Sequence, residues 1–261
     1  AMHKQFSSVR IETGYRTDTI LIKLNPPIIA NEQQVITEPM PLELKHYVSG
    51  TEIRYTLDGT DPDSLRSPVY SPPVMLDKNC LLKAKAYKPG WISSDIVQTN
   101  FFRSVYAPDS VQLISQPAPN YKGIGGKTII DKEKSDLNFR NGKWLGYQGN
   151  TMESIIWFRK PVMLQNVTIS SIVDIGSYIM PPVSLEVWGG KEPGKLALLS
   201  KLTPEQPVKP DLPYLKGYEC NFKPAEIQYL KIVAKAVPVM PAWHPGKGDK
   251  GWFFIDELFF N

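Results

Sequence analysis

Residues 229–261 read YLKIVAKAV, then PVMPAWHPGKGDKG, then WFFIDELFFN. In the first part, polar and apolar side chains alternate, which is the period-two pattern of a strand with one buried face. Residues 252–260 form a second run, aromatic and branched, that is too apolar to lie on the surface. The connection carries three prolines and three glycines, so it is stiff and sharply bent. We expect the two runs to be strands that close a β-fold as a hairpin-like pair.

The composition is that of a globular chain built from short strands. Its 261 residues, 42% hydrophobic and 21% charged, suffice for two domains with a core each. The 24 prolines favour short strands joined by shaped turns, because proline is excluded from helix interiors and central strands. The net charge of +4 is mild and no run of five like charges occurs, which argues against a nucleic-acid partner.

Neither a membrane span nor an export signal is visible in these residues. Apolar runs stay well below the roughly 18 residues that a spanning helix needs, and no apolar run follows the start. Ala1-Met2 is typical of an introduced start, so we expect a fragment of a longer protein that is secreted, periplasmic or attached to the cell surface. We also expect a monomer in which Cys80 and Cys220 are unpaired thiols, because they fall in different predicted domains.

The first half contains several short alternating strands. The clearest covers residues 52–57 and is followed by the tight-turn dipeptide Asp58-Gly59; residues 80–87 form another. Short strands at near-regular spacing, with turn residues between them, are typical of an immunoglobulin-type or fibronectin-type sandwich. The polar, proline-bearing residues 104–120 then predict a linker that contains one short strand at residues 111–114.

A family resemblance makes the fold prediction for the first half more specific. Residues 53–97, IRYTLDGTDPDSLRSPVYSPPVMLDKNCLLKAKAYKPGWISSDIV, resemble the fibronectin-like domain found C-terminal to the barrel of chitobiases and β-hexosaminidases. The resemblance spans residues 25–103. It leaves residues 1–24 as a lead-in, which we expect to be a tag plus the end of an upstream domain. It implies a structural module that packs beside catalytic or binding domains and carries no chemistry itself.

Residues 121–261 also favour β-structure, and no stretch shows helical periodicity over three turns. The segments NFRNGKWLGYQGNTMESIIWF, VSLEVWGG and AWHPGKGDKGWFFIDELFFN are similar to discoidin-like domains, the coagulation-factor C type, in the variant appended to β-hexosaminidases and other secreted proteins of gut Bacteroidetes. The chain departs from that variant at Asp131-Lys132 and Asn141-Gly142. The expected fold is therefore all-β: two β-sandwiches, an immunoglobulin/fibronectin-like one followed by a discoidin-like jelly roll.

The motifs exclude several kinds of catalytic site. Gly126-Lys127 lacks the glycine that a phosphate-binding loop needs five residues earlier, where Tyr121 stands. No serine elbow and no zinc-spaced Cys/His cluster occurs. The pair Asp256-Glu257 mimics a glycosidase acid pair, but neighbouring strand residues point to opposite faces, whereas glycoside hydrolysis needs two carboxyls roughly 5 to 9.5 Å apart across one sugar. We expect no catalytic activity in this chain.

A structural calcium ion is one implication of the discoidin resemblance. Such domains often hold the ion between an early acidic loop and a glutamate in the last strand. Glu257 matches that glutamate, and Asp131 and Asp136 would supply further oxygen ligands. Lys132 and Lys134, however, put positive charge where the ion would lie. The alternative is that Glu257 hydrogen-bonds the early loop directly.

Glycan binding would use the aromatic residues of the loops. An aromatic ring stacks on the C–H face of a sugar while charged side chains bind its hydroxyls. The candidate glycan-binding residues are Trp243, His244, Tyr178, Asp174 and Lys143. The alternative is that Trp243 and His244 only pack inside their loop.

We therefore expect a non-catalytic accessory region of a secreted or surface carbohydrate-active protein, a chitobiase or β-hexosaminidase by resemblance. Its discoidin-like half would bind a glycan, of N-acetylhexosamine type or another surface polysaccharide, or dock on the upstream catalytic domain. No cofactor is required under this interpretation. The competing hypothesis is a purely structural or protein-interaction module without affinity for sugars.

Overall fold

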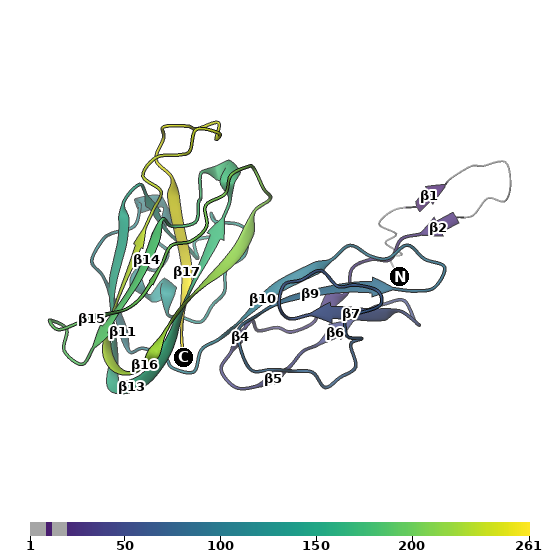
Figure 1. The fold of residues 1–261 in the computed structure, drawn as a ribbon, viewed down its shortest axis with the longest axis horizontal. Coiled ribbons are helices and arrows are strands. Elements are labelled where there is room, and N and C mark those ends of the chain that lie inside the picture. Colours follow the sequence, from purple (N-terminus) through teal and green to yellow (C-terminus); the bar gives the residue numbers. More distant parts are fainter. Residues whose placement is uncertain (1–8, 12–19) are drawn as a thin grey trace. The chain divides into compact units, whose positions relative to one another are not determined.

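The computed structural model describes residues 9–11 and 20–261 and divides the chain into two compact units, Ala1–Phe102 and Arg103–Asn261 (Figure 1). Much of the expected lead-in, residues 1–8 and 12–19, lies outside the described residues. Within the described part, helical structure is limited to the 3-10 turns η1 (Pro119–Tyr121), η2 (Gly125–Ile129) and η3 (Ile175–Ser177), and the expected all-β class is confirmed. No helix among these residues is long and apolar enough to cross a membrane.

The first unit is built on a four-stranded sheet. Its order is β4 (Val35–Ile36), β10 (Val97–Arg103), β9 (Cys80–Tyr87) and β7 (Glu52–Thr56). Two-stranded ladders join β1 (Val9–Ile11) to β2 (Ile20–Ile22), β3 (Ile28–Ile29) to β6 (Leu44–Lys45), and β5 (Met40–Pro41) to β8 (Met75–Leu76). Leu44 and Leu76 of the ladders share one core with Leu82 and Phe101 of the sheet, as a sandwich requires.

The second unit is one antiparallel sheet that folds over on itself. Its order is β12 (Leu145–Gln148), β17 (Trp252–Phe260), β13 (Thr151–Val173), β16 (Tyr214–Lys235), β14 (Ser184–Gly190) and β15 (Ala197–Leu202), and β11 (Ser110–Leu113) also pairs with β13. The register of β13 on β16 shifts between Trp157 and Val162. Before this shift β13 pairs with β11, and after it with β17. The two halves of β13 and β16 therefore lie in opposite layers around one core (Figure 1).

The short strand expected within residues 104–120 is present as β11, which pairs with β13 of the second unit. One sequence-based expectation needs correction. The strands on either side of the proline-rich connection do not form a hairpin-like pair. Residues 229–235 pair with residues 151–157, whereas β17 pairs with residues 167–172 in the other layer. The connection 236–251 consequently crosses from one layer to the other over the end of the sandwich.

Burial of β17 on both faces explains its unbroken apolar sequence. Phe253 and Ile255 face the interior of the sandwich, whereas Phe254 packs in a second cluster with Trp144. The ring centroid of Tyr121 lies 4.8 Å from that of Phe254, so the segment before β12 covers the outer face of β17. Each buried aromatic side chain contributes on the order of 2 kcal/mol through loss of its contact with water. Trp144, which is 1% exposed, is thus a core residue.

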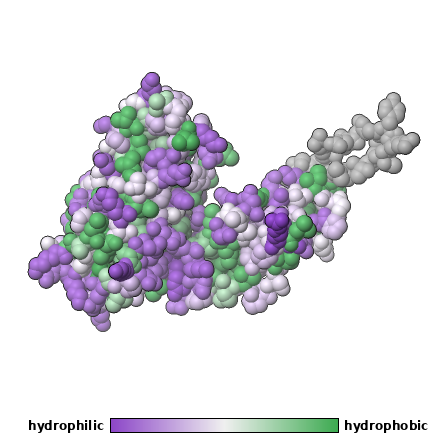
Figure 2. All heavy atoms as spheres, viewed as in Figure 1, coloured by the Kyte–Doolittle hydropathy of each residue, from purple (hydrophilic) through white to green (hydrophobic). Residues whose placement is uncertain are grey.

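The exposed surface mixes polar and apolar residues. On the face drawn in Figure 2, apolar residues form small, separate patches between hydrophilic ones. Val208 and Leu212, in the loop between β15 and β16, are 80% and 81% exposed. Single exposed apolar side chains are common on globular domains, so neither residue marks an interface by itself.

Candidate functional site at one end of the second sandwich

Three loops meet where β13 ends and β16 begins. They are residues 174–183 between β13 and β14, residues 203–213 between β15 and β16, and residues 236–251 between β16 and β17. An apolar cluster lies beneath them, and partly buried side chains from each side pack against it. The cluster consists of Val173, Ile175, Met180, Val237 and Met240, with Tyr178, Val183, Tyr214 and Trp243 packed on it. We call this region the loop end.

His244 is a buried clamp within the loop end. His244 is only 5% exposed, and its Nε2 lies 2.9 Å from the carbonyl oxygen of Ile175. Its Nδ1 accepts the N–H of Gly246 at 2.9 Å. Because Nδ1 is an acceptor, Nε2 carries the proton and donates it to Ile175. Nε2 therefore holds loop 236–251 against loop 174–183, while Nδ1 fixes the turn within loop 236–251. This is the packing role that was the alternative to glycan binding for His244.

Tyr178 packs against the same clamp. Its backbone is left-handed, with a φ of 66°, and its ring lies edge-on to the imidazole of His244 with centroids 4.9 Å apart. Gly246 touches the ring so closely that a Cβ there would lie 2.0 Å from Cε1 of Tyr178. The half-buried ring is thus wedged between two loops, and its flat face is not a free stacking surface.

The other three candidate glycan-binding residues lie in different settings. Trp243 is half-buried on the apolar cluster, with its ring 5.7 Å from that of His244. Asp174 caps η3 by accepting the N–H of Ser177 at 3.2 Å. Lys143 is exposed in the loop before β12 and pairs with Glu133 at 2.9 Å. The structure therefore brings Trp243, His244 and Tyr178 together, while Asp174 and Lys143 serve their own loops.

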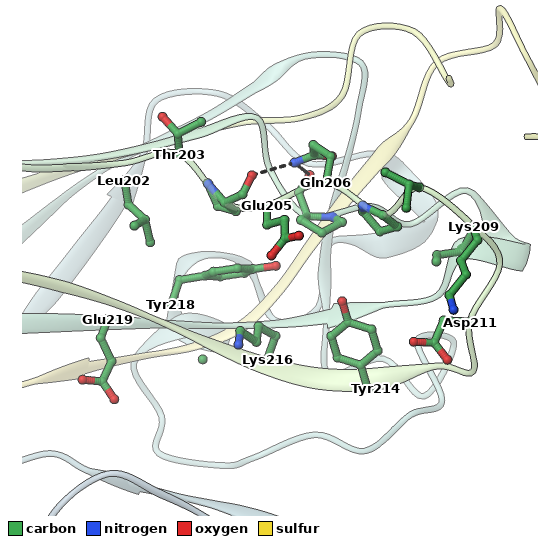
Figure 3. A pocket seen from close by; sticks show the side chains of 16 residues that line it. Leu202, Thr203, Glu205, Gln206, Lys209, Asp211, Tyr214, Lys216, Tyr218 and Glu219 are labelled. Atoms are coloured by element: carbon green, nitrogen blue, oxygen red, sulfur yellow. Dashed lines mark hydrogen bonds between the residues drawn. The ribbon is translucent and has the colours of Figure 1, made fainter. Parts of the chain in front are cut away.

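A cleft of about 660 Å³ opens beside this cluster, between loop 203–213 and the first residues of β16 (Figure 3). Tyr214 and Tyr218 form one wall, and Ile175 connects the cleft to the cluster that supports Trp243. Gln206 holds the opposite loop in place by donating to the carbonyl oxygens of Pro181 and Pro182, both at 3.2 Å. The cleft is therefore a shaped feature of the fold.

Tyr218 is the unusual group in the cleft. It is 5% exposed, and its hydroxyl is buried without a hydrogen-bond partner among the described residues. Burial, and then the nearby Tyr214, raise the pKa of Tyr218 far above its ordinary value, so the group stays a neutral phenol. Burial also raises the pKa of Tyr214, with smaller effects from Asp211 and Glu205. Buried hydroxyls nearly always have a partner, so an unpaired one in a residue that lines a cleft is exceptional.

Sequence reasoning missed this cleft, although a signal was present. Prolines recur at every third position in TPEQPVKPDLPY, a spacing that favours an extended, rigid segment. The segment ends at Tyr214, and Tyr218 follows four residues later on β16. The sequence pattern does not show that loop 174–183 lies on the opposite side of the cleft. That position depends on how the sheet folds over on itself.

The two acidic residues of β17 lie at a bulge. Ser170 pairs with Glu257 and Ser171 with Ile255, so Asp256 is the extra residue. Both carboxylates consequently receive donors from the same loop: the N–H of Lys132 donates to Glu257 at 2.5 Å and the N–H of Ser135 to Asp256 at 2.9 Å. The expectation that these side chains point to opposite faces is therefore wrong, because regular alternation fails at a bulge.

The predicted calcium ligands do not converge on a cation site. Asp136 caps its own turn by accepting the N–H of Asn138 at 2.9 Å. The ammonium of Lys134 pairs with Asp256 at 2.5 Å. Among the residues that the structure describes, no group of three His, Cys, Asp or Glu side chains could hold a metal ion. Calcium needs six to eight oxygen ligands, and here N–H and ammonium groups face the carboxylates instead.

Burial raises the pKa of Glu257 to about 9, with further contributions from Asp131 and Asp256. Glu257 is therefore a neutral carboxylic acid at pH 7. It shares a hydrogen bond with Asp131, whose pKa is also raised by burial. Glu257 therefore hydrogen-bonds the early loop directly. This is the arrangement that was the alternative to a calcium site.

Comparisons with known proteins add the following similarities. A family model described as "Fn3 associated" matches residues 42–101, within the first unit. No curated protein sequence matches the chain.

Solved structures similar to this chain include carbohydrate-binding modules of low sequence identity. The CBM32 module of AlyQ, in complex with 4,5-unsaturated mannuronic acid, is 13% identical over 60% of this chain and 96% of that one, with a TM-score of 0.38. A pectin-binding carbohydrate-binding module is 12% identical over 59% and 90%, also with a TM-score of 0.38. The CBM32-1 and CBM32-2 domains of Clostridium perfringens ZmpB, with GalNAc, are 13% identical over 59% and 32%, with a TM-score of 0.36.

Proposed function

We propose that the second unit is a non-catalytic module that binds a glycan in the cleft at its loop end. The observation that supports this most directly is the unpaired, buried hydroxyl of Tyr218 facing a cleft of about 660 Å³. This volume lies within the range of about 300 to 1,000 Å³ that is usual for small-molecule sites. A hydroxyl-rich ligand that displaces the side chains covering the Tyr218 hydroxyl would give it the partner that it lacks.

The chemistry of the lining suits a sugar. Tyr214 is half-buried and offers a ring for stacking against sugar C–H groups. Glu205 and Asp211 supply acceptors for hydroxyls, and Lys209 and Lys216 supply donors. Acids and bases are mixed along the cleft, which favours a polyhydroxylated ligand over a strongly charged one. Trp243, on the shared apolar cluster, would flank the site.

The wider setting is part of the same proposal. The resemblance of residues 25–103 to a chitobiase-associated domain supports a parent protein that degrades glycans, with an N-acetylhexosamine-type sugar as the first ligand to test. The accessory region would act as a monomer outside the cytoplasm, holding the catalytic domain near its substrate. The first unit would act as a spacer.

Docking of a protein domain is a second candidate function. Val208 and Leu212 are 80% and 81% exposed on the loop that forms one side of the cleft. Two large apolar side chains on one rim favour contact with a protein surface. In this case the cleft would receive a side chain of the partner domain.

Glycan-array screening of the labelled chain, followed by calorimetry with the strongest ligand, tests the proposal. We expect Tyr214→Ala to weaken binding at least tenfold through lost stacking, and Tyr218→Phe to weaken it about fivefold through one lost hydrogen bond. Tyr229→Phe, in the other half of β16, is the matched control. The double variant Val208→Ser/Leu212→Ser should keep sugar affinity. Binding that ignores both cleft tyrosines, or no binding to any glycan, would contradict the proposal.

A further inference from the structure

We propose that the ammonium group of Lys134 is a built-in cation, which fastens residues 131–135 to β17 in the place where the discoidin resemblance implies a metal ion. The inference is independent of the glycan site, because residues 131–135 and the bulge of β17 do not line the cleft. It predicts a second unit whose stability does not depend on divalent metal.

The position of the ammonium is that of an internal counterion. The Lys134 side chain is 5% exposed and that of Asp256 is 0% exposed, and their charged groups are 2.5 Å apart. The same ammonium donates to the hydroxyl of Ser170, which is also fully buried. A lysine is rarely buried unless it is paired, so this arrangement requires both partners.

The backbone around Lys134 supports the same assignment. The N–H groups of Lys132 and Ser135 point at Glu257 and Asp256, so the loop presents donors to the carboxyl groups. Lys132 adopts a left-handed backbone, with a φ of 64°, immediately before this turn. A divalent ion would instead need carbonyl oxygens directed at it. The polarity of the loop is therefore opposite to that of a cation site.

The charge of Asp256 is balanced without a further ion. The ammonium of Lys134 pairs with it directly, and the neighbouring Glu257 side chain accepts the N–H of Lys132. The second oxygen of Asp256, Oδ1, has no partner within the described chain. A monovalent ammonium satisfies one carboxylate oxygen here, whereas a metal ion could engage both.

Calorimetric unfolding of the full chain, with millimolar calcium chloride or with EDTA, tests the proposal on the unaltered protein. We expect the transition of the second unit to move by less than about 1 °C, because no ion binds the folded state. A rise of several degrees with calcium would overturn the proposal.

The variant Lys134→Met tests the role of the ammonium itself. Because it leaves a buried carboxylate unpaired, we expect the transition to fall by about 10 °C. Lys143→Met removes an exposed lysine of the same loop and should change it by about 1 °C or less. In Lys134→Met/Asp256→Asn the charges are removed together, and we expect part of the loss to be recovered. Equal effects of the two lysine variants, or a double variant with additive losses, would refute the assignment.

Discussion

The Nε2 atom of His244 lies 2.9 Å from the carbonyl oxygen of Ile175, across the end of the second sandwich. The two residues are 69 positions apart in the chain and belong to loops that follow strands in different layers. The hydrogen bond therefore joins the connection 236–251 to the turn that follows β13. It gives His244 a structural role beside the cleft, rather than a place in it.

Replacing His244 with alanine should loosen this connection. The change leaves the N–H of Gly246 without its partner and removes one of the two donors to the carbonyl of Ile175, which also accepts the N–H of Tyr178. We expect this to cost about 2 kcal/mol of unfolding free energy. Urea denaturation measures the loss, and limited proteolysis should reveal faster cleavage within residues 241–249. Lys247→Ala, exposed in the same loop, is the control. If both variants unfold at the wild-type urea concentration, His244 is not a clamp.

Gly246→Ala should be harmful because of the close approach of Tyr178. The added Cβ would lie 2.0 Å from Cε1 of the ring, so the tyrosine must move. We expect a loss of about 2 kcal/mol, in the usual range for overpacking. Gly194→Ala, where a Cβ meets nothing within 4 Å, should be nearly neutral. Smaller damage from Gly246→Ala in a Tyr178→Ala background would confirm that the ring is the obstacle.

The stability of the second unit should depend on pH through Glu257. Its pKa is raised in the folded state to about 9, from an ordinary value of 4.5. Between these two values the folded state binds the proton and the unfolded state does not, so the unfolding free energy falls as pH rises. The contribution is on the order of 1 kcal/mol per pH unit, complete below pH 4.5 and lost by about pH 9.

Glu257→Gln isolates that contribution, because glutamine keeps the shape and stays neutral. We expect the variant to unfold like the wild type near pH 4 and to become the more stable protein as pH rises toward 8. Guanidinium denaturation across this range supplies the comparison. Parallel pH profiles for the two proteins would show that Glu257 ionises normally in the fold.

The two cysteines should react slowly with alkylating reagents. Both are free thiols, and burial raises the pKa of Cys80 and Cys220 to about 11 each. Since the thiolate is the nucleophile, little reactive form exists at pH 8. We expect iodoacetamide to modify the folded chain at least tenfold more slowly than the chain in urea, as followed by mass spectrometry. Equal rates in the two conditions would mean that the thiols are accessible.

Several local features could be predicted from the sequence because their causes are local. The Asp58-Gly59 turn is present, with Gly59 at a φ of +79° and the Asp58 carboxylate accepting the N–H of Thr60. The alternating run at residues 80–87 forms β9, and the aromatic run forms β17. Each depends on side-chain periodicity or on the conformational freedom of one residue.

The glycan-binding candidates show where local reasoning ends. Trp243 and His244 occupy a shaped loop, as their prolines suggest, but the donor that His244 offers is used by Ile175. Tyr214 and Tyr218 look like ordinary strand residues in the sequence. Only the packing of loop 203–213 against the turn after β13 makes a cleft beside them.

The amino-acid sequence alone determined the all-β class, the strand character of most segments and the stiffness of the connection 236–251. Alternation, proline content and turn dipeptides act over a few residues, so they can be recognised in the sequence without knowledge of the fold. Tertiary structure decided which strands pair: residues 229–235 and β17 lie in different layers because β13 and β16 bend together at the register shift after Trp157. It also decided, through the bulge at Asp256, that Asp256 pairs with Lys134 and that Glu257 accepts the N–H of Lys132 in the same loop. Such contacts join residues more than 100 positions apart, and no local pattern encodes them.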